Sequence, residues 1–152
     1  MEAKLSWKEK MSFVGVADSG HEVRVDSDAS VGGDDSAARP MELIALGLAG
    51  CTGMDVISIL RKKQQKVAAF DVNVSAERAA EHPKVFTKAV ITYVLRGEGL
   101  DEAALVRAIE LSALKYCPAQ AMLSKAFPME LRYQIYEGDA LVKAGTWQPP
   151  AA

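Results

Sequence analysis

Two cysteines are the residues of this chain best suited to covalent chemistry. Cys51 lies among glycines in a long apolar segment, and Cys117 directly precedes Pro118. The thiolate form of cysteine is a good nucleophile, and two thiols that meet in a fold can be oxidised to a disulfide. Cys51 and Cys117 are therefore candidates for a redox-active pair, provided that the fold brings them together.

Other interpretations of the cysteines remain open at this point. Free cysteine is among the most buried residue types, so two unrelated buried thiols would need no chemistry at all. A zinc site would require His21 and His82, and neither histidine falls at a spacing typical of zinc ligands. The sequence also lacks a Ser/His/Asp triad, a phosphate-binding loop and a dinucleotide-binding glycine pattern, so we expect no metal and no other cofactor.

The local sequence predicts different surroundings for the two thiols. Pro118 suits the first turn of a helix, which makes Cys117 the N-cap residue. Free backbone N–H groups and the helix dipole favour a thiolate there, and the charge of Lys115 would add to this effect. Cys51 lies about eleven residues into its helix, roughly 16 Å from the positive end, so a positive group from elsewhere must activate it.

The elements that carry the cysteines can be predicted from the apolar pattern. Strands are expected at residues 4–9, 11–17, 21–26, 68–80, 85–96 and 130–136, a loop at 27–38, and helices at 40–65, 102–115 and 118–125. The helix at 102–115 would be capped by Asp101. This order predicts an α+β chain with two groups of antiparallel strands.

The helix expected at 40–65 carries apolar residues on every side, which predicts a position at the centre of the fold. Gly47, Gly50 and Gly53 recur every three residues along it and leave a strip without side-chain bulk. Glycine weakens a helix by about 1 kcal/mol relative to alanine, so a close approach by another backbone would explain the strip. Ordinary packing of the helix remains an alternative explanation.

The composition is that of an ordinary globular domain. The chain has 152 residues and a formal net charge of −2, which indicates one domain at residues 1–144, a loose tail at 145–152 and no nucleic-acid partner. The charged first ten residues do not resemble a signal peptide, so we expect a cytoplasmic protein. Residues 43–60 are apolar enough to consider a membrane span, but their glycines and Asp55 argue against one.

Five segments, in this order, resemble the OsmC/Ohr family of thiol-dependent peroxidases. They are residues 40–43 (PMEL), 48–55 (LAGCTGMD), 82–88 (HPKVFTK), 107–112 (RAIELS) and 115–118 (KYCP). The resemblance extends over nearly the whole chain. Its most specific feature is a glycine-flanked helical cysteine followed much later by a Cys-Pro pair.

The resemblance implies an OsmC-like fold and a cysteine-based reaction. The fold would be an intertwined homodimer, with two antiparallel sheets around long central helices and an active site at each subunit interface. Cys51 would attack an organic hydroperoxide and become a sulfenic acid, and Cys117 would resolve it as a disulfide. A dithiol such as dihydrolipoamide would be the reductant. The alternative is a non-catalytic module that binds a lipophilic small molecule at the dimer interface.

The resemblance also implies an arginine that holds the thiolate and the peroxide, and a glutamate that orients the arginine. The family's glutamate directly follows the proline, where this chain has Met41, so Glu42 is the candidate. Arg39 is the candidate arginine, and Arg24 is an alternative. Glu42 lies nine positions before Cys51, which places the two side chains on opposite sides of the helix.

Overall fold

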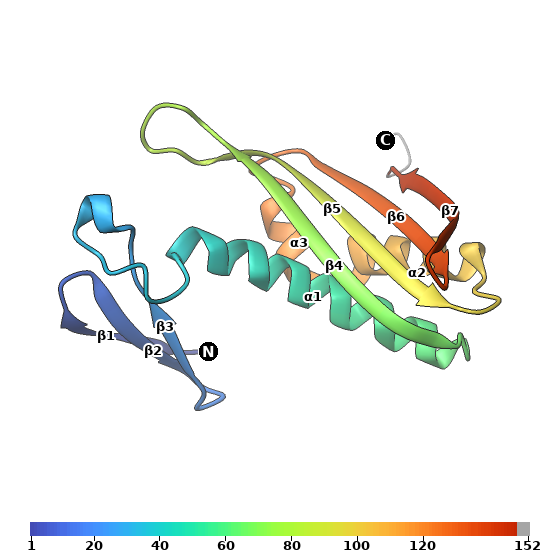
Figure 1. The fold of residues 1–152 in the computed structure, drawn as a ribbon, viewed down its shortest axis with the longest axis horizontal. Coiled ribbons are helices and arrows are strands. Elements are labelled where there is room, and N and C mark those ends of the chain that lie inside the picture. Colours follow the sequence, from blue (N-terminus) through green and yellow to red (C-terminus); the bar gives the residue numbers. More distant parts are fainter. Residues whose placement is uncertain (149–152) are drawn as a thin grey trace. The chain divides into compact units, whose positions relative to one another are not determined.

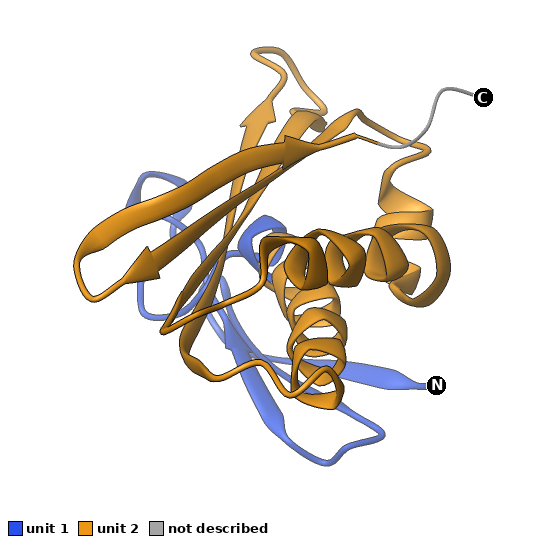
Figure 2. Ribbon diagram, turned by 90° about the vertical axis from the view of Figure 1, so that its right-hand side faces the viewer, with its two compact units in different colours: residues 1–44 blue, residues 45–152 orange. Residues whose placement is uncertain are grey.

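The computed structural model describes residues 1–148 and divides the chain into two compact units (Figures 1 and 2). Unit 1 is Met1–Ile44 and unit 2 is Ala45–Ala152. The sequence indicated one domain at residues 1–144. The division arises because the first three strands pair only with one another and not with the strands of unit 2.

Unit 1 contains the predicted three-stranded meander. Its strands are β1 (Ala3–Glu9), β2 (Ser12–Ala17) and β3 (Glu22–Val25), and they pair antiparallel in the order β1-β2-β3. The turn between β2 and β3 contains Gly20, whose φ of +78° is a conformation that glycine adopts without strain. The prediction of this meander is confirmed.

A buried aspartate organises the loop that follows β3. Asp26 is only 2% exposed. Its carboxylate accepts hydrogen bonds from the backbone N–H groups of Ser27 at 2.8 Å, Asp34 at 3.1 Å and Ser36 at 3.1 Å, and from the Ser36 hydroxyl at 2.7 Å. The loop passes so close to Ser27 at Gly33 that any Cβ there would overlap the Ser27 carbonyl oxygen. These bonds, those to Ser36 most strongly, lower the pKa of Asp26 to about 2.

Asp26→Asn is expected to destabilise unit 1 at neutral pH, because it removes the charge that four donors converge on. The folded pKa of about 2 lies below the ordinary 3.8, so the carboxylate stabilises the fold above pH 3.8 and loses this effect as the pH falls towards 2. The urea midpoint of Asp26→Asn should therefore lie below that of wild type at pH 7, and the gap should narrow below pH 3.8. Asp139→Asn, at an exposed position, is the control. A gap that does not change with pH would contradict this account.

Helix α1 (Pro40–Lys62) begins where the sequence predicted and ends three residues earlier. Its end is set by Gln64, which adopts a positive φ of 57°. The N–H of Gln65 then reaches back to the carbonyl of Leu60 at 3.0 Å, a bond that closes the helix in the manner of a Schellman motif. The sequence offered no glycine at this position to signal the stop.

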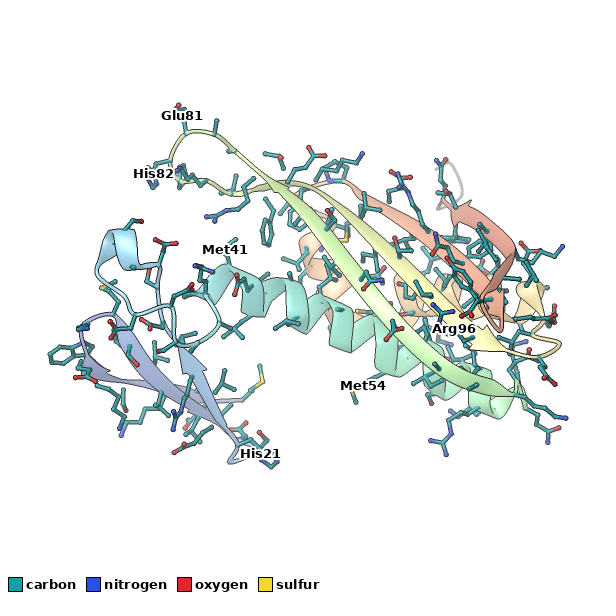
Figure 3. The ribbon with its side chains drawn as sticks, viewed as in Figure 1. His21, Met41, Met54, Glu81, His82 and Arg96 are labelled. Atoms are coloured by element: carbon teal, nitrogen blue, oxygen red, sulfur yellow. The ribbon has the colours of Figure 1, made fainter. Side chains whose placement is uncertain are left out.

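Within unit 2, α1 is buried along one stripe rather than on every side. Leu48, Thr52, Val56 and Leu60, spaced four apart, form the buried stripe together with Gly53, where a Cβ would lie 3.1 Å from Val72. The opposite side exposes apolar residues: Leu46 is 61% exposed, and Met54, which projects from the helix in Figure 3, is 73% exposed. The expectation of a helix surrounded on all sides is thus wrong for the chain taken alone.

The length and apolar composition of α1 also match those of a membrane span. The helix nevertheless carries Asp55, whose carboxylate accepts a hydrogen bond from the Ser112 hydroxyl at 3.0 Å. Together with the buried stripe, this bond is typical of the core helix of a folded domain. That α1 does not span a membrane stays a prediction.

Unit 2 contains a four-stranded sheet in the order β4-β5-β6-β7. The strands are β4 (Val67–Arg78), β5 (Phe86–Gly97), β6 (Met129–Glu137) and β7 (Ala140–Trp147). β5 and β6 are parallel, so the prediction of purely antiparallel strands is wrong for this sheet. The helical segment between these two strands returns the chain to the same end of the sheet, as a parallel pairing requires.

Strand β7 was not predicted. Most of its residues are exposed, so it shows no clear apolar alternation. It includes Gly145–Trp147, the first part of the segment that was expected to be a loose tail; the rest of that prediction, residues 149–152, lies outside the described residues. β7 pairs antiparallel with β6, which explains why these residues are ordered.

Three short helical segments join β5 to β6. They are α2 (Glu102–Leu111), the π-helical turn η2 (Ser112–Tyr116) and α3 (Pro118–Leu123). Asp101 caps α2 as predicted, and its carboxylate accepts from the N–H of Ala103 at 2.9 Å. The helices of unit 2 lie on one face of its sheet (Figure 2). The core between them includes Val56, Leu60, Ile91, Leu95, Leu105, Ile109 and Ile135.

Candidate functional site

The fold brings the two cysteines together. Cys51, in the middle of α1, is half-buried, and Cys117, at the start of α3, is 2% exposed. Both are free thiols, and the Cys51 thiol lies near enough to the Cys117 thiol to affect its pKa. The two thiols are therefore neighbours in the fold, although they are far apart in the sequence.

Cys117 is the N-cap residue of α3, as the sequence predicted. Its Sγ accepts a hydrogen bond from the N–H of Gln120 at 3.3 Å, and Pro118 occupies the first turn. The π-helical turn η2 leads into this cap, and the N–H of Cys117 bonds to the carbonyl of Ser112 at 2.9 Å. Single π turns often occur at functional sites.

The N–H groups of this cap favour a thiolate at Cys117, as predicted, but other effects on its pKa are larger. Burial, together with the nearby Cys51 thiol, raises the pKa of Cys117 well above its ordinary value and outweighs the Gln120 N–H. The side chain of Lys115 is exposed, and its ammonium group lies 5.4 Å from the centre of the Tyr116 ring. Lys115 therefore does not support a thiolate at Cys117. Cys117 is therefore a neutral thiol at pH 7, which suits a resolving cysteine better than an attacking one.

A buried polar cluster, formed by Thr52, Tyr93, Ser112 and Gln120, adjoins Cys117. The Thr52 hydroxyl is 2.6 Å from the Tyr93 hydroxyl, 2.9 Å from the Ser112 hydroxyl and 2.7 Å from Nε2 of Gln120. Nε2 of Gln120 also lies 3.1 Å from the Tyr93 hydroxyl, and Ser112 donates to Asp55. Among the described residues, no buried side-chain nitrogen or oxygen lacks a partner. Such fully bonded clusters make a core rigid.

The sequence interpretation missed this cluster as part of the site. Burial raises the pKa of Tyr93 to about 12, so its hydroxyl remains neutral and is available for hydrogen bonding. Thr52 falls on the buried stripe of α1, where a lone polar residue among apolar ones is a signal for a buried bond. No comparable signal marks Gln120, because its partners lie in distant parts of the chain.

Arg39 and Glu42 are paired with each other in unit 1. The guanidinium of Arg39 lies 3.3 Å from the Glu42 carboxylate, 2.8 Å from that of Asp35 and 3.2 Å from that of Asp28. The Arg39 backbone N–H donates to Glu42 at 2.9 Å, and this bond is the main cause that lowers the pKa of Glu42. Arg24, the alternative arginine, is exposed on β3. Glu42 is thus one of three carboxylates paired with Arg39, and the roles of Arg39 and Glu42 at Cys51 stay predictions.

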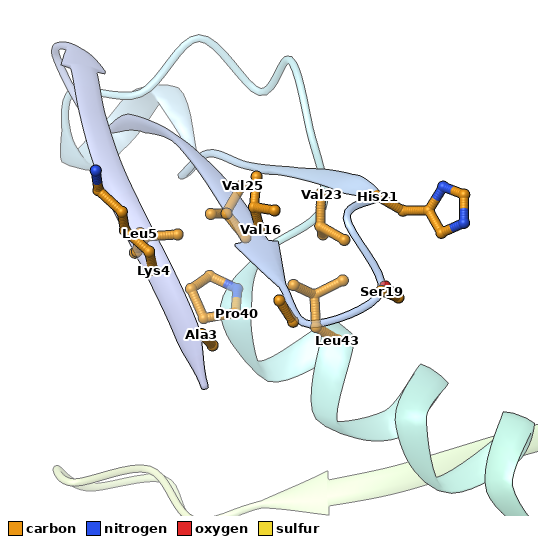
Figure 4. Close-up of a pocket in the computed structure, with 12 residues that line it drawn as sticks. Ala3, Lys4, Leu5, Val16, Ser19, His21, Val23, Val25, Pro40 and Leu43 are labelled. Carbon is orange, nitrogen blue, oxygen red and sulfur yellow. The ribbon is translucent and has the colours of Figure 1, made fainter. Parts of the chain in front are cut away.

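Each unit contains a cavity. The cavity of unit 1, of about 440 Å³, is lined mainly by apolar side chains of the three strands together with Pro40 and Leu43 (Figure 4). Unit 2 has several cavities, and one of about 340 Å³ is bordered by Gln120, Leu131 and Trp147. This cavity adjoins the buried polar cluster, through Gln120.

The described residues offer the cysteines no partners for a metal ion. Within residues 1–148, no group of three or more His, Cys, Asp or Glu side chains lies close enough to hold one. His82 lies at the tip of the β4–β5 hairpin, and His21 precedes β3 in unit 1 (Figure 3).

The chain is similar to known proteins in sequence and in fold. The OsmC-like protein family matches residues 33–132 of the chain. Protein YhfA of Escherichia coli K12 is 36% identical over 135 residues, which are 89% of this chain and 98% of YhfA. A protein of Aquifex aeolicus has a crystal structure with a TM-score of 0.78 and 29% identity, and the match covers 90% of this chain and 96% of that one.

A more distant structure shares the fold. It is an organic hydroperoxide resistance protein from Elizabethkingia anophelis, with a TM-score of 0.65, 16% identity and coverage of 90% of this chain and 94% of that one. The matched residues 33–132 contain both cysteines and the four residues of the buried polar cluster. By its sequence match, its relatives and its fold, the chain belongs to the OsmC-like protein family.

Proposed function

We propose that this protein is a thiol-dependent peroxidase that reduces organic hydroperoxides through Cys51 and Cys117. The observation that carries the proposal is the proximity of a half-buried Cys51 thiol to a buried Cys117 thiol. A shared redox reaction explains why two cysteines that are far apart in the sequence are neighbours in the fold. The shared fold with an organic hydroperoxide resistance protein supports the choice of substrate.

The reaction follows from the different exposure of the two sulfurs. The thiolate of Cys51 attacks one peroxide oxygen, the O–O bond breaks, and the departing alkoxide takes up a proton to become an alcohol. Cys51 is left as a sulfenic acid. The sulfur of Cys117 then attacks that of Cys51, and hydroxide leaves with the Cys117 proton as water. A dithiol such as dihydrolipoamide restores both thiols by exchange.

We also propose a homodimer that acts in the cytoplasm, where reduced dithiols are available. The exposed side of α1 supports self-association, because Leu46 and Met54 are uncovered there and Gly47 and Gly50 have no other side chain near them. In such a dimer Arg39, held by Glu42, would supply the positive group that Cys51 needs. Large exposed apolar surfaces commonly mark protein interfaces.

Intact-mass measurement tests the reaction directly. One equivalent of cumene hydroperoxide should convert the reduced protein to a species lighter by two hydrogen atoms, because both thiols are consumed in one disulfide. The control is Cys117→Ser, which should gain one oxygen instead. An unchanged mass for the reduced wild-type protein would rule out the proposed peroxidase.

A second candidate function is the binding of a lipophilic small molecule without catalysis. It is favoured by the apolar cavity of unit 1, a unit that contains neither cysteine. For such a module, the mass after peroxide treatment should not change, and wild type and Cys117→Ser should behave alike. The same experiment therefore separates the two functions.

A further inference from the structure

We infer that the hydrogen bond between Gln120 and Thr52 is a clamp that holds Cys51 and Cys117 at the spacing needed to form a disulfide. Both residues are thereby positioning residues, because neither needs to touch the peroxide. A role for the clamp in catalysis rests on the proposed function. Its effect on disulfide formation between the two sulfurs can be measured without any peroxide.

Gln120 is bonded to Cys117 and to Thr52, the residue next to Cys51. Its backbone N–H donates to Sγ of Cys117 at 3.3 Å, and its side-chain Nε2 donates to Oγ1 of Thr52 at 2.7 Å. Thr52 is the residue that directly follows Cys51 in α1. The two hydrogen bonds of Gln120, together with the peptide bond between Cys51 and Thr52, thus link the backbones that carry the two cysteines.

The clamp is anchored at both ends. Thr52 is fully buried, and its hydroxyl also contacts the hydroxyls of Tyr93 and Ser112. Gln120 is 4% exposed, so water does not compete strongly for its amide. A bond in such surroundings holds its partners more tightly than the same bond at a surface.

The short helix that carries Cys117 needs an anchor of this kind. α3 has only six residues, and helices of that length are not stable by themselves. Gln120 is the only residue of α3 that is fully buried among those the structure describes. Its bond to Thr52 is therefore the polar link by which α3 is held to α1.

The chemical consequence is a high effective concentration of one thiol beside the other. In a buffer of reduced and oxidised dithiothreitol, Cys51 and Cys117 each give up one proton and one electron, and an S–S bond forms between them. The disulfide of oxidised dithiothreitol accepts both electrons and both protons and opens to the dithiol. The equilibrium constant of this exchange measures how well the two sulfurs are held together.

Thr52→Val removes the hydroxyl at nearly constant volume, and Thr52→Ser keeps it. We expect Thr52→Val, which removes the bond to Gln120 together with those to Tyr93 and Ser112, to lower the exchange equilibrium constant at least about tenfold. Thr52→Ser should stay within about twofold of wild type for the same reason. Gln120→Met, which removes the bond from the other side, should resemble Thr52→Val, and the double variant should be no worse than either single one.

Ser112→Ala is the control that shows whether the loss of any hydrogen bond in the buried polar cluster weakens disulfide formation. It removes a different bond to the same Thr52 hydroxyl and leaves the Gln120 bond in place. The clamp predicts an equilibrium constant close to that of wild type for Ser112→Ala. An equal loss in Ser112→Ala and Thr52→Val, or no loss in Thr52→Val, would overturn the clamp, as would a wild-type protein that forms no disulfide in this buffer.

The experiment also separates the clamp from the proposed function. If wild type forms the disulfide with oxidised dithiothreitol, and Thr52→Val does so less well, the clamp holds whether or not the protein reduces a hydroperoxide. If the protein reduces hydroperoxides normally but the exchange equilibrium constant is unchanged in the Thr52 and Gln120 variants, the proposed peroxidase function is supported and the clamp is ruled out.

Discussion

Cys51→Ser is expected to abolish the reduction of organic hydroperoxides, with a rate lower by at least about a thousandfold. The physical reason is the nucleophile itself: a serine hydroxyl is hardly ionised at neutral pH, whereas a thiol reaches its thiolate form readily. Cys51 is the more exposed of the two sulfurs, and it is therefore the one that a peroxide can reach. Cys117 does not replace it, because burial keeps that thiol protonated.

The measurement is the consumption of cumene hydroperoxide in the presence of dihydrolipoamide, followed over many turnovers. Ser58→Ala, at an exposed position on the same helix, is the matched control and should retain the wild-type rate. Circular dichroism should show that both variants are folded. Undiminished turnover in Cys51→Ser would mean that another residue attacks the peroxide and that Cys51 is not the nucleophile.

Cys117→Ser is expected to allow the first chemical step and to stop the cycle after it. The variant keeps the attacking sulfur, so one equivalent of peroxide should still be reduced to alcohol. No second sulfur is then available within bonding distance, and the sulfenic acid of Cys51 persists or is oxidised further. Sustained turnover with a dithiol should fall at least about tenfold, because the reductant must now attack a half-buried sulfenic acid in place of a disulfide.

Dimedone, which reacts with sulfenic acids, provides the readout. After one equivalent of peroxide, Cys117→Ser should be labelled at Cys51, and wild type should show little label. Cys51→Ser should not be labelled at all. Equal labelling of wild type and Cys117→Ser would mean that Cys117 does not resolve the sulfenic acid.

Much of the fold could be predicted because local patterns determine it. The alternation of Val23 and Val25 marked β3, and Pro40 and Asp101 marked the starts of two helices. β7 escaped prediction because an edge strand with mostly exposed residues carries little apolar signal. The parallel pairing of β5 and β6 depends on where the intervening helices return the chain, which no short segment of sequence specifies.

The sequence by itself determined the two cysteines as the chemical candidates and the position of Cys117 as a helix N-cap, because a cap depends only on its immediate neighbours. Only the tertiary structure decided the rest of the site. It brought the thiol of Cys51 to that of Cys117, enclosed Thr52 and Gln120 in one hydrogen-bonded cluster, and buried Cys117 deeply enough to reverse the expected direction of its pKa shift. Burial and contact depend on residues far apart along the chain, and in this site desolvation outweighs the local field of the helix.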